Sequence, residues 1–251
     1  MATKTAAIKT AMVLAAGFGK RMRPITETIP KPLVPVLGVP MLESIIAKLR
    51  TAGIERIVVN GFYLKEQIQR FVESYDDPMI MFSEEHEILE TGGGVTQALP
   101  LLGNDPFVVV NGDVCWLDGG SSAIKRIMDF WNPDVMDALL LVHPRSKAYG
   151  YEGAGDFFLG NDQKLNRRAE ETSAPYVYAG IQILHPKLFV AVPTEAFSLN
   201  EIFDKALASN RLCGLEHDGE WFHVGTPEGL REVEDLLQNM LPTDPNPVAL
   251  E

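Results

Sequence analysis

The 251-residue sequence predicts an α/β fold, built on a mostly parallel sheet flanked by helices. Short apolar runs, which suit buried parallel strands, alternate through residue 143 with stretches whose apolar residues have helical spacing. Turns that contain glycine follow the first and fourth apolar runs, and a triple glycine follows the third. Parallel sheets bind ligands at the carboxyl ends of their strands, so these three signals predict a binding site at one edge.

The first part of the chain contains five predicted strands and four predicted helices. Strands are expected at 11–14, 57–59, 79–82, 107–110 and 138–142, and helices at 40–50, 64–72, 95–99 and 123–131. The first helix has apolar residues three and four positions apart and ends at Gly53. Right-handed crossovers between successive strands would give the parallel sheet.

The sequence changes character after Pro144. Residues 149–155 are rich in glycine and aromatics, and the polar stretch 159–175 predicts a long loop or a mobile hairpin. Strands are expected at 176–184, 212–215 and 221–224, and helices at 199–208 and 227–239, the last with Thr226 as N-cap. We expect one domain over 1–241, comprising a core at 8–143, a closing layer over the sheet at 144–226 and a C-terminal helix at 227–241, with a frayed tail at 242–251.

Charge and composition exclude several classes of protein. The formal net charge of −12 argues against general binding to nucleic acid or to anionic membranes. No apolar run approaches the roughly 20 residues that a membrane helix needs. The apolar run near the N-terminus is short and leads directly into a glycine turn, so we expect a buried strand there and not a signal peptide. Cys115 and Cys213 form no spaced motif, which favours free thiols and a cytoplasmic location, and the number of subunits is left open.

The stretch from Met12 to Pro35 concentrates positive charge beside a glycine turn. Gly17 and Gly19 can offer backbone N–H groups to an anion, and Lys20, Arg21, Arg23 and Lys31 follow within the same stretch. A glycine turn alone indicates no more than a tight turn, and the spacing fits neither the P-loop nor the dinucleotide fingerprint. With Arg21 and Lys31, however, the stretch suits a polyanion such as a triphosphate.

A second signal is the tripeptide Asn111-Gly112-Asp113 at the end of the fourth predicted strand. A carboxylate in this position suits a Mg²⁺ ion that bridges phosphate oxygens. The alternative is an Asx turn, in which Asp113 binds its own backbone.

These segments resemble the signature of the sugar-1-phosphate nucleotidylyltransferases. The resemblance rests on LAAGFGKRMRPITETIPKPLVPVLGVPML, ETGGG, NGD, YAGIQILHP and WFHVGTPE, which span most of the chain. Within the family, the LETGGG and PLLGNDPFVVVNGDV segments most resemble the N-acetylmuramic acid 1-phosphate uridylyltransferases, and the first half resembles mannose-1-phosphate guanylyltransferases nearly as well. The family implies a Rossmann-like, GT-A-like nucleotidyltransferase fold with a smaller sugar-binding region at 144–226.

The resemblance also implies roles for individual residues. It makes Arg21, Lys31 and Asp113 catalytic: Arg21 grips the triphosphate, Lys31 stabilises charge during transfer, and Asp113 holds Mg²⁺, with Mn²⁺ as an alternative. The residues implied in nucleotide binding are Leu14, Ala15, Ala16, Gly17, Gly19, Arg21, Glu85, Gly92, Gly93 and Asn111.

Glu85 falls where the family has a polar residue that contacts the base. A carboxylate only accepts hydrogen bonds, so it would favour uracil or guanine over cytosine. The alternative is a solvated acidic loop, because several other glutamates are near. Gly92 and Gly93 would let the base lie against the backbone.

His223 departs from the family pattern, which has a second metal-binding aspartate at this position. Histidine is a poor ligand for Mg²⁺. His223 could bind the metal directly or through water, contact phosphate as a cation, or mark a weakened site; the first of these is our prediction.

The sugar side is implied to include Gly155, Tyr178 and Gly180, although Tyr178 could equally be a core aromatic. The remaining histidines, which are His86, His143, His185 and His217, are expected at the surface or in loops.

The predicted function is transfer of a nucleoside monophosphate from a nucleoside triphosphate, with UTP favoured, to a sugar 1-phosphate, with N-acetylmuramic acid 1-phosphate favoured. The partners would be these two substrates, with no nucleic acid and no membrane. Two alternatives are a guanylyltransferase acting on mannose or heptose 1-phosphate and a non-catalytic nucleotide-binding module.

Overall fold

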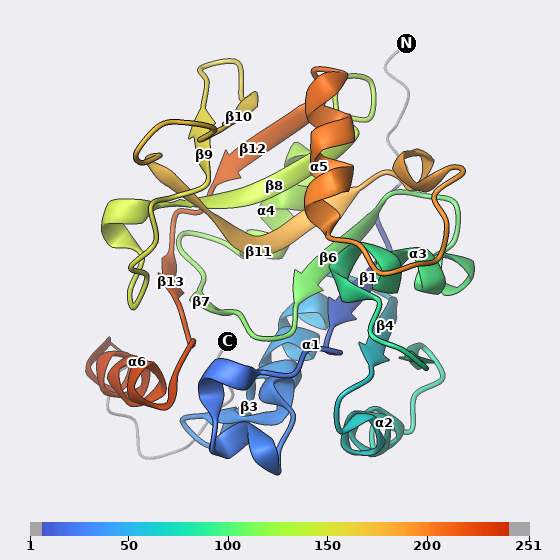
Figure 1. Ribbon diagram of the computed structural model, residues 1–251, viewed down its shortest axis with the longest axis vertical. Helices are drawn as coiled ribbons and strands as arrows, with labels where there is room; N and C mark the ends of the chain where they lie inside the picture. The colour runs from blue at the N-terminus through green and yellow to red at the C-terminus, as the bar shows by residue number, and fades with distance from the viewer. Residues whose placement is uncertain (1–6, 241–251) are drawn as a thin grey trace.

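Four parallel strands form the centre of the structure, a computed structural model that describes residues 7–240. They lie in the order β6 (Phe107–Asn111), β1 (Thr10–Leu14), β4 (Arg56–Gly61) and β5 (Ile80–Glu84). Each strand pairs in parallel with its neighbour, so all four carboxyl ends meet at one edge (Figure 1). This arrangement confirms the predicted mostly parallel sheet.

The second half of the chain extends the same sheet. β11 (Tyr176–Leu184) pairs antiparallel with β6 and with β8 (Ala138–Pro144), and β12 (Leu212–Glu216) pairs parallel with β8. β9 (Phe157–Leu159) and β10 (Leu165–Arg167) form an antiparallel hairpin beside β11. Within residues 7–240 the sheet therefore has nine strands. The expected closing layer is wrong in this respect, because β11 is buried along most of its length and joins the sheet instead of covering it.

Helices cover both faces of the sheet. One face carries α1 (Met41–Thr51), α2 (Lys65–Glu73) and α4 (Ala123–Phe130), and the other carries α3 (Glu90–Leu102) and α5 (Leu199–Ala208). α6 (Pro227–Met240) packs away from the sheet, and Thr226 caps it as predicted, since Gly229 N donates to Thr226 Oγ1 at 3.1 Å. In the described part of the chain, no helix has the length and apolar character needed to cross a membrane.

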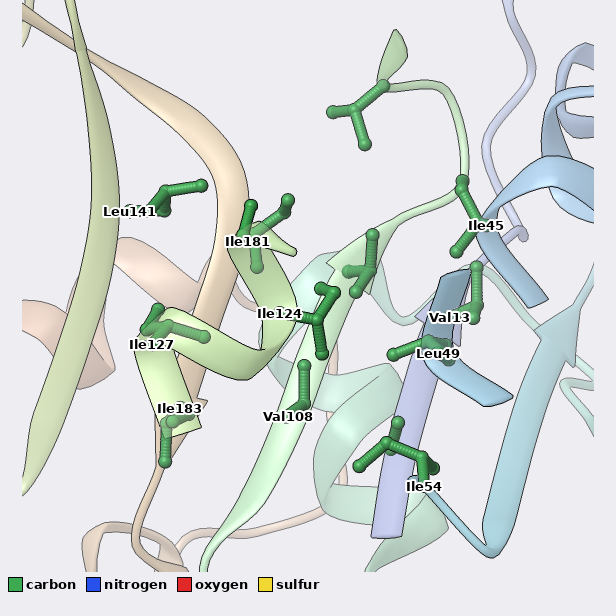
Figure 2. Close-up of a cluster of buried hydrophobic side chains, with 14 of the residues drawn as sticks. Val13, Ile45, Leu49, Ile54, Val108, Ile124, Ile127, Leu141, Ile181 and Ile183 are labelled. Atoms are coloured by element: carbon green, nitrogen blue, oxygen red, sulfur yellow. The ribbon is translucent and has the colours of Figure 1, made fainter. Parts of the chain in front are cut away.

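Alternation along the strands divides the apolar side chains between the two faces. On β1, Val13 enters the core beneath α1 and α4, whereas Met12 enters the core beneath α3 and α5. Figure 2 shows Ile45 and Leu49 of α1 close to Val13, and Ile124 of α4 beside Val108 of β6. These two cores fix the parallel strands, and with them the edge where the turns gather.

Two small sheets and several of the 3₁₀ turns lie at or near that edge, whereas Pro186–Phe189 follows β11 at the opposite edge, because β11 is antiparallel to β6. β2 (Pro35–Val36) pairs with β3 (Val39–Pro40), and β7 (Cys115–Leu117) pairs with β13 (Glu220–Phe222). The second pair brings the segment that contains His223 beside the turn after β6. The 3₁₀ turns are Lys20–Met22, Ile25–Glu27, Lys31–Leu33, Arg145–Lys147 and Pro186–Phe189.

Two sequence-based predictions need correction. The helix predicted at 95–99 begins at Glu90 instead, so the three glycines lie inside α3. His143 was expected at the surface or in a loop, but it lies in β8 and is 1% exposed, with its ring 5.7 Å from that of His217, which lies in a loop as expected but is 2% exposed. The predicted tail at 242–251 and residue 241 lie outside the described residues.

Candidate active site

A cavity of about 540 Å³ opens at the carboxyl ends of β1 and β6. It is bounded by the glycine turn after β1, by the segment around Lys31 and by the start of α3. The predicted site residues that line it are Leu14, Ala15, Ala16, Gly17, Gly19, Arg21, Lys31, Asn111 and Asp113. The structure thus brings together every predicted catalytic residue and the glycine turn.

The glycine turn is held from two sides. Ala15 N donates to Asn60 Oδ1 at 2.7 Å, and Thr26 Oγ1 donates to Gly19 O at 2.8 Å. Gly19 has φ +58°, and a Cβ there would lie 3.0 Å from side-chain atoms of both Lys31 and Thr26, so the turn requires glycine. No atom lies within 4 Å of a Cβ built on Gly17, which leaves the turn's backbone open to a ligand.

Lys31 and Asp113 form an ion pair across the cavity floor. Lys31 Nζ donates to Asp113 Oδ2 at 2.7 Å, and the Lys31 side chain is only 9% exposed. Pro30 and Pro32 flank the lysine, and Gly112 N donates to Leu14 O at 2.8 Å, which fixes the turn that carries Asp113 against β1. Each partner is therefore placed by backbone geometry as well as by the other's charge.

Asp113 and Glu90 are the carboxylates that line the cavity, and Asp113 is the one that lies beside Lys31 at the end of β6. Its side chain is 41% exposed, and the oxygen that does not bind Lys31 remains free to take a hard cation. Among residues 7–240 there is no cluster of three His, Cys, Asp or Glu side chains that could enclose a metal. A site with one carboxylate suits Mg²⁺, which completes its shell with phosphate oxygens and water.

His223, the second predicted metal ligand, lies beside a cation. Its Nε2 is 3.5 Å from Arg21 Nη1, and its backbone N donates to Tyr149 O at 2.8 Å. Burial lowers the pKa of His223, and the positive charges of Arg21 and Lys31 lower it further. Asp113 opposes this shift, but the net direction disfavours the alternative in which His223 contacts phosphate as a cation.

Glu85, which was predicted to contact the base, is not among the residues that line the cavity. The residue is 0% exposed, and its carboxylate accepts hydrogen bonds from Asn60 Nδ2 at 2.6 Å and from Leu89 N at 3.2 Å. Burial raises the pKa of Glu85, although both hydrogen bonds oppose that shift. Glu85 thus orients Asn60, and Asn60 in turn holds Ala15, so the carboxylate supports the glycine turn from behind.

Gly92 and Gly93 face the loop before α5 and not the cavity. A Cβ on Gly92 would lie 2.2 Å from the ring of Phe197, and one on Gly93 would lie 2.0 Å from Glu195 O. Gly92 N also donates to Phe197 O at 2.8 Å. These glycines therefore permit close packing of that loop on α3, and they are not among the residues that line the cavity.

The predicted sugar-side residues surround the cavity without lining it. Gly180 abuts its wall, since a Cβ there would lie 3.3 Å from Asn111 Nδ2. Tyr178 packs edge-on against Phe203 with ring centroids 5.7 Å apart, and its buried hydroxyl has no hydrogen-bond partner among the described residues. Burial raises the pKa of Tyr178 well above its usual value, with a smaller effect from Asp113. Gly155 packs closely against the backbone oxygen of Ala174.

Sequence reasoning missed four polar positions of the cavity wall: Asn60, Glu90, Thr91 and Ser198. Asn60 could have been found, because it lies near the end of the second parallel strand, at the same edge as Asn111. Thr91 and Ser198 meet only through tertiary packing, in which Leu199 N donates to Thr91 Oγ1 at 2.9 Å.

A family model described as "Nucleotidyl transferase" matches residues 10–239. The chain belongs to this family. Among the relatives of this nucleotidyl transferase is the N-acetylmuramate alpha-1-phosphate uridylyltransferase of Caulobacter vibrioides, 36% identical over 91% of this chain and 97% of the relative. The protein of the same description from Neisseria meningitidis serogroup B is 34% identical over 90% of this chain and 97% of its own length.

A mannose-1-phosphate guanyltransferase of Hypocrea jecorina is 30% identical over 86% of this chain and 61% of its own length. The crystal structure of a UDP-glucose pyrophosphorylase complexed with UDP-glucose superposes on the nucleotidyl transferase with a TM-score of 0.78. It covers 93% of this chain and 100% of the other at 16% identity, which supports the fold assignment.

Proposed function

We propose that the chain transfers UMP from UTP to N-acetylmuramic acid 1-phosphate and releases pyrophosphate. An oxygen of the sugar phosphate attacks the α-phosphorus of UTP and forms the new P–O bond. The bond from the α-phosphorus to its bridging oxygen breaks, and pyrophosphate leaves with the electron pair. The nucleophile is already an anion, so no general base is needed, and catalysis depends on positioning and charge.

The observation that carries this proposal is the Lys31–Asp113 pair at the foot of the open glycine turn. A buried ammonium 2.7 Å from a half-exposed carboxylate can neutralise phosphate charge while the carboxylate holds a metal ion. Arg21 lines the same cavity and supplies a second cation for the triphosphate. Asp113 would hold Mg²⁺, and Mn²⁺ could replace it.

Similarity to the relatives supports the substrate assignment. The two uridylyltransferases align over 97% of their own lengths, whereas the guanyltransferase aligns over 61% of its length.

We assign nucleotide binding to residues 8–143 and sugar binding to 144–226, near Tyr178 and Gly180. The reaction would serve peptidoglycan recycling, in the cytoplasm, where the unpaired thiols of Cys115 and Cys213 stay reduced.

Pyrophosphate release with all four nucleoside triphosphates and a panel of sugar 1-phosphates tests the proposal. We expect the highest kcat/KM with UTP and N-acetylmuramic acid 1-phosphate in the presence of Mg²⁺. Preference for GTP with mannose or heptose 1-phosphate would replace the proposal with the guanylyltransferase alternative. Tight nucleotide binding without turnover in Mg²⁺ or Mn²⁺ would instead establish a non-catalytic nucleotide-binding module.

A further inference from the structure

The imidazole of His223 is held in one orientation by its surroundings. The ring stands edge-on to Tyr151, with centroids 6.2 Å apart, and is tilted against Trp221 at 6.0 Å. Its backbone is fixed to Tyr149 O. A Cβ on Gly225 would lie 2.6 Å from Nε2, so the loop leaves room for the ring only because glycine stands there.

This orientation directs Nε2 at the guanidinium of Arg21, 3.5 Å from Nη1. A guanidinium has only donors, so the contact is favourable when Nε2 is the unprotonated acceptor nitrogen and Nδ1 carries the hydrogen. A lone pair that faces one cation is poorly placed to bind a second. Asp113, by contrast, presents a free carboxylate oxygen to the cavity.

Arg21 gains orientation from this contact without losing charge. Its side chain is exposed, and the nearby carboxylate, Asp113, pairs with Lys31 instead. A long arginine side chain has about 2 kcal/mol of rotamer entropy, part of which a fixed acceptor can remove before the ligand binds. An aspartate at 223 would form an ion pair with Arg21 and compete with phosphate, whereas neutral histidine leaves the full positive charge available.

From this geometry we infer that His223 is a positioning residue that holds Arg21 toward the triphosphate, and that it is not a metal ligand. Asp113 is then the protein's metal-binding carboxylate, and the segment after β13 contributes to nucleotide affinity through Arg21. The inference rests on the proposed function, because it requires that Arg21 bind the phosphates of a nucleotide.

Three variants at one position test the role in affinity. His223→Ala should raise the KM for UTP about tenfold with little change in kcat, because a hydrogen bond that orients a charged group in both ground and transition states is lost. His223→Gln keeps a neutral acceptor and should recover most of that affinity. His223→Asp should not recover it, because its carboxylate neutralises Arg21. Recovery by Asp but not by Gln would overturn the inference.

Pulsed EPR of Mn²⁺ with a non-hydrolysable UTP analogue provides a readout that does not depend on turnover. We expect no imidazole ¹⁴N coupling in the wild type and the same Mn²⁺ affinity in His223→Gln. A ¹⁴N signal that disappears in His223→Gln would show direct ligation and overturn the inference. The variant His86→Gln serves as control for adventitious binding, because His86 is 83% exposed and lies 3.6 Å from Glu84.

Calorimetric binding of the UTP analogue separates this inference from the proposed function. If the wild type binds no nucleotide, both the proposed function and the inference about His223 are wrong. If it binds nucleotide and His223→Ala binds it equally well, the proposed function stands and the inference is overturned. Thermal unfolding of the His223→Ala variant excludes a general loss of structure as the cause of its weaker binding.

Discussion

Lys31 Nζ lies 2.7 Å from Asp113 Oδ2, and this pair joins two segments 82 residues apart in sequence. The lysine comes from a proline-flanked turn and the aspartate from the end of β6. Gly112, next to Asp113, donates to Leu14 O at the end of β1, and Pro32, next to Lys31, lies close to Gly112. The parallel strands therefore position this pair, and they place a cation and a carboxylate beside the glycine turn that follows β1.

Asp113→Asn should abolish measurable turnover while leaving the fold intact. The amide oxygen can still accept from Lys31, but the neutral side chain no longer holds a divalent cation. We expect kcat to fall by at least about 10²-fold, the scale for losing one electrostatic stabiliser of the transition state. The measurement is pyrophosphate release in saturating Mg²⁺, with thermal unfolding as control. Retained turnover would refute the assignment of Asp113 as the metal carboxylate.

Glu85→Gln distinguishes support of the glycine turn from contact with the base. If Glu85 acts through Asn60, the variant should lower kcat/KM for all nucleotides by a similar factor and keep the preference for UTP. A changed ratio of UTP to CTP or GTP would restore the direct role at the base that the sequence suggested. Asn60→Ala provides the matched comparison: it leaves buried partners on Ala15 and Glu85 unsatisfied and should cost about 1–3 kcal/mol of unfolding free energy.

Local periodicity was enough to predict most strands of the large sheet and most helices, because most of these strands are short apolar runs closed by a turn, whereas the short strands β2, β3, β7, β9 and β10 were not predicted. The predicted start of α3 was wrong, and the reason is physical. Three consecutive glycines each disfavour a helix by about 1 kcal/mol, and only packing of the loop at Phe197, more than 100 residues away, offsets that cost. A sequence window cannot contain that contact.

The residues of the candidate site also divide into those that local sequence predicts and those placed by tertiary contacts. Arg21, Lys31 and Asp113 were predictable, since each has a charge in a turn at a strand end. The burial of Glu85 was not predicted, because its carboxylate accepts from Asn60, near the end of the neighbouring strand β4, and that contact spans 25 positions. His223 was recognised as unusual, but its contact with Arg21 spans 202 positions and appears only in the folded chain.

Acid should destabilise the protein through His143 and His217. Burial lowers the pKa of both histidines below the usual 6.5, and hydrogen bonds with the backbone oppose the shift, from Lys147 at His143 and from Glu220 at His217. The unfolded state therefore binds more protons than the folded state below about pH 6.5, so stability is lost as pH falls. Each histidine contributes a slope of up to about 1.4 kcal/mol per pH unit.

Urea unfolding at pH 5.5 and 7.5 measures this effect. His143→Leu should flatten the dependence, because leucine suits the apolar face that His143 shares with Leu141 and removes one titrating group. An unchanged slope in this variant would show that other groups cause the acid sensitivity.

Gly93→Ala should destabilise the protein even though alanine favours helices. The new Cβ would lie 2.0 Å from Glu195 O, a backbone atom, so the loop before α5 must shift. Overpacking of this kind costs about 1–3 kcal/mol, against a gain of about 1 kcal/mol in helix propensity. Because Ser198 of that loop lines the cavity, the KM for UTP should also rise. Gly120→Ala is the matched control, since nothing lies within 4 Å of its Cβ position. Chemical unfolding of both variants checks the prediction, which fails if Gly93→Ala is as stable as the wild type.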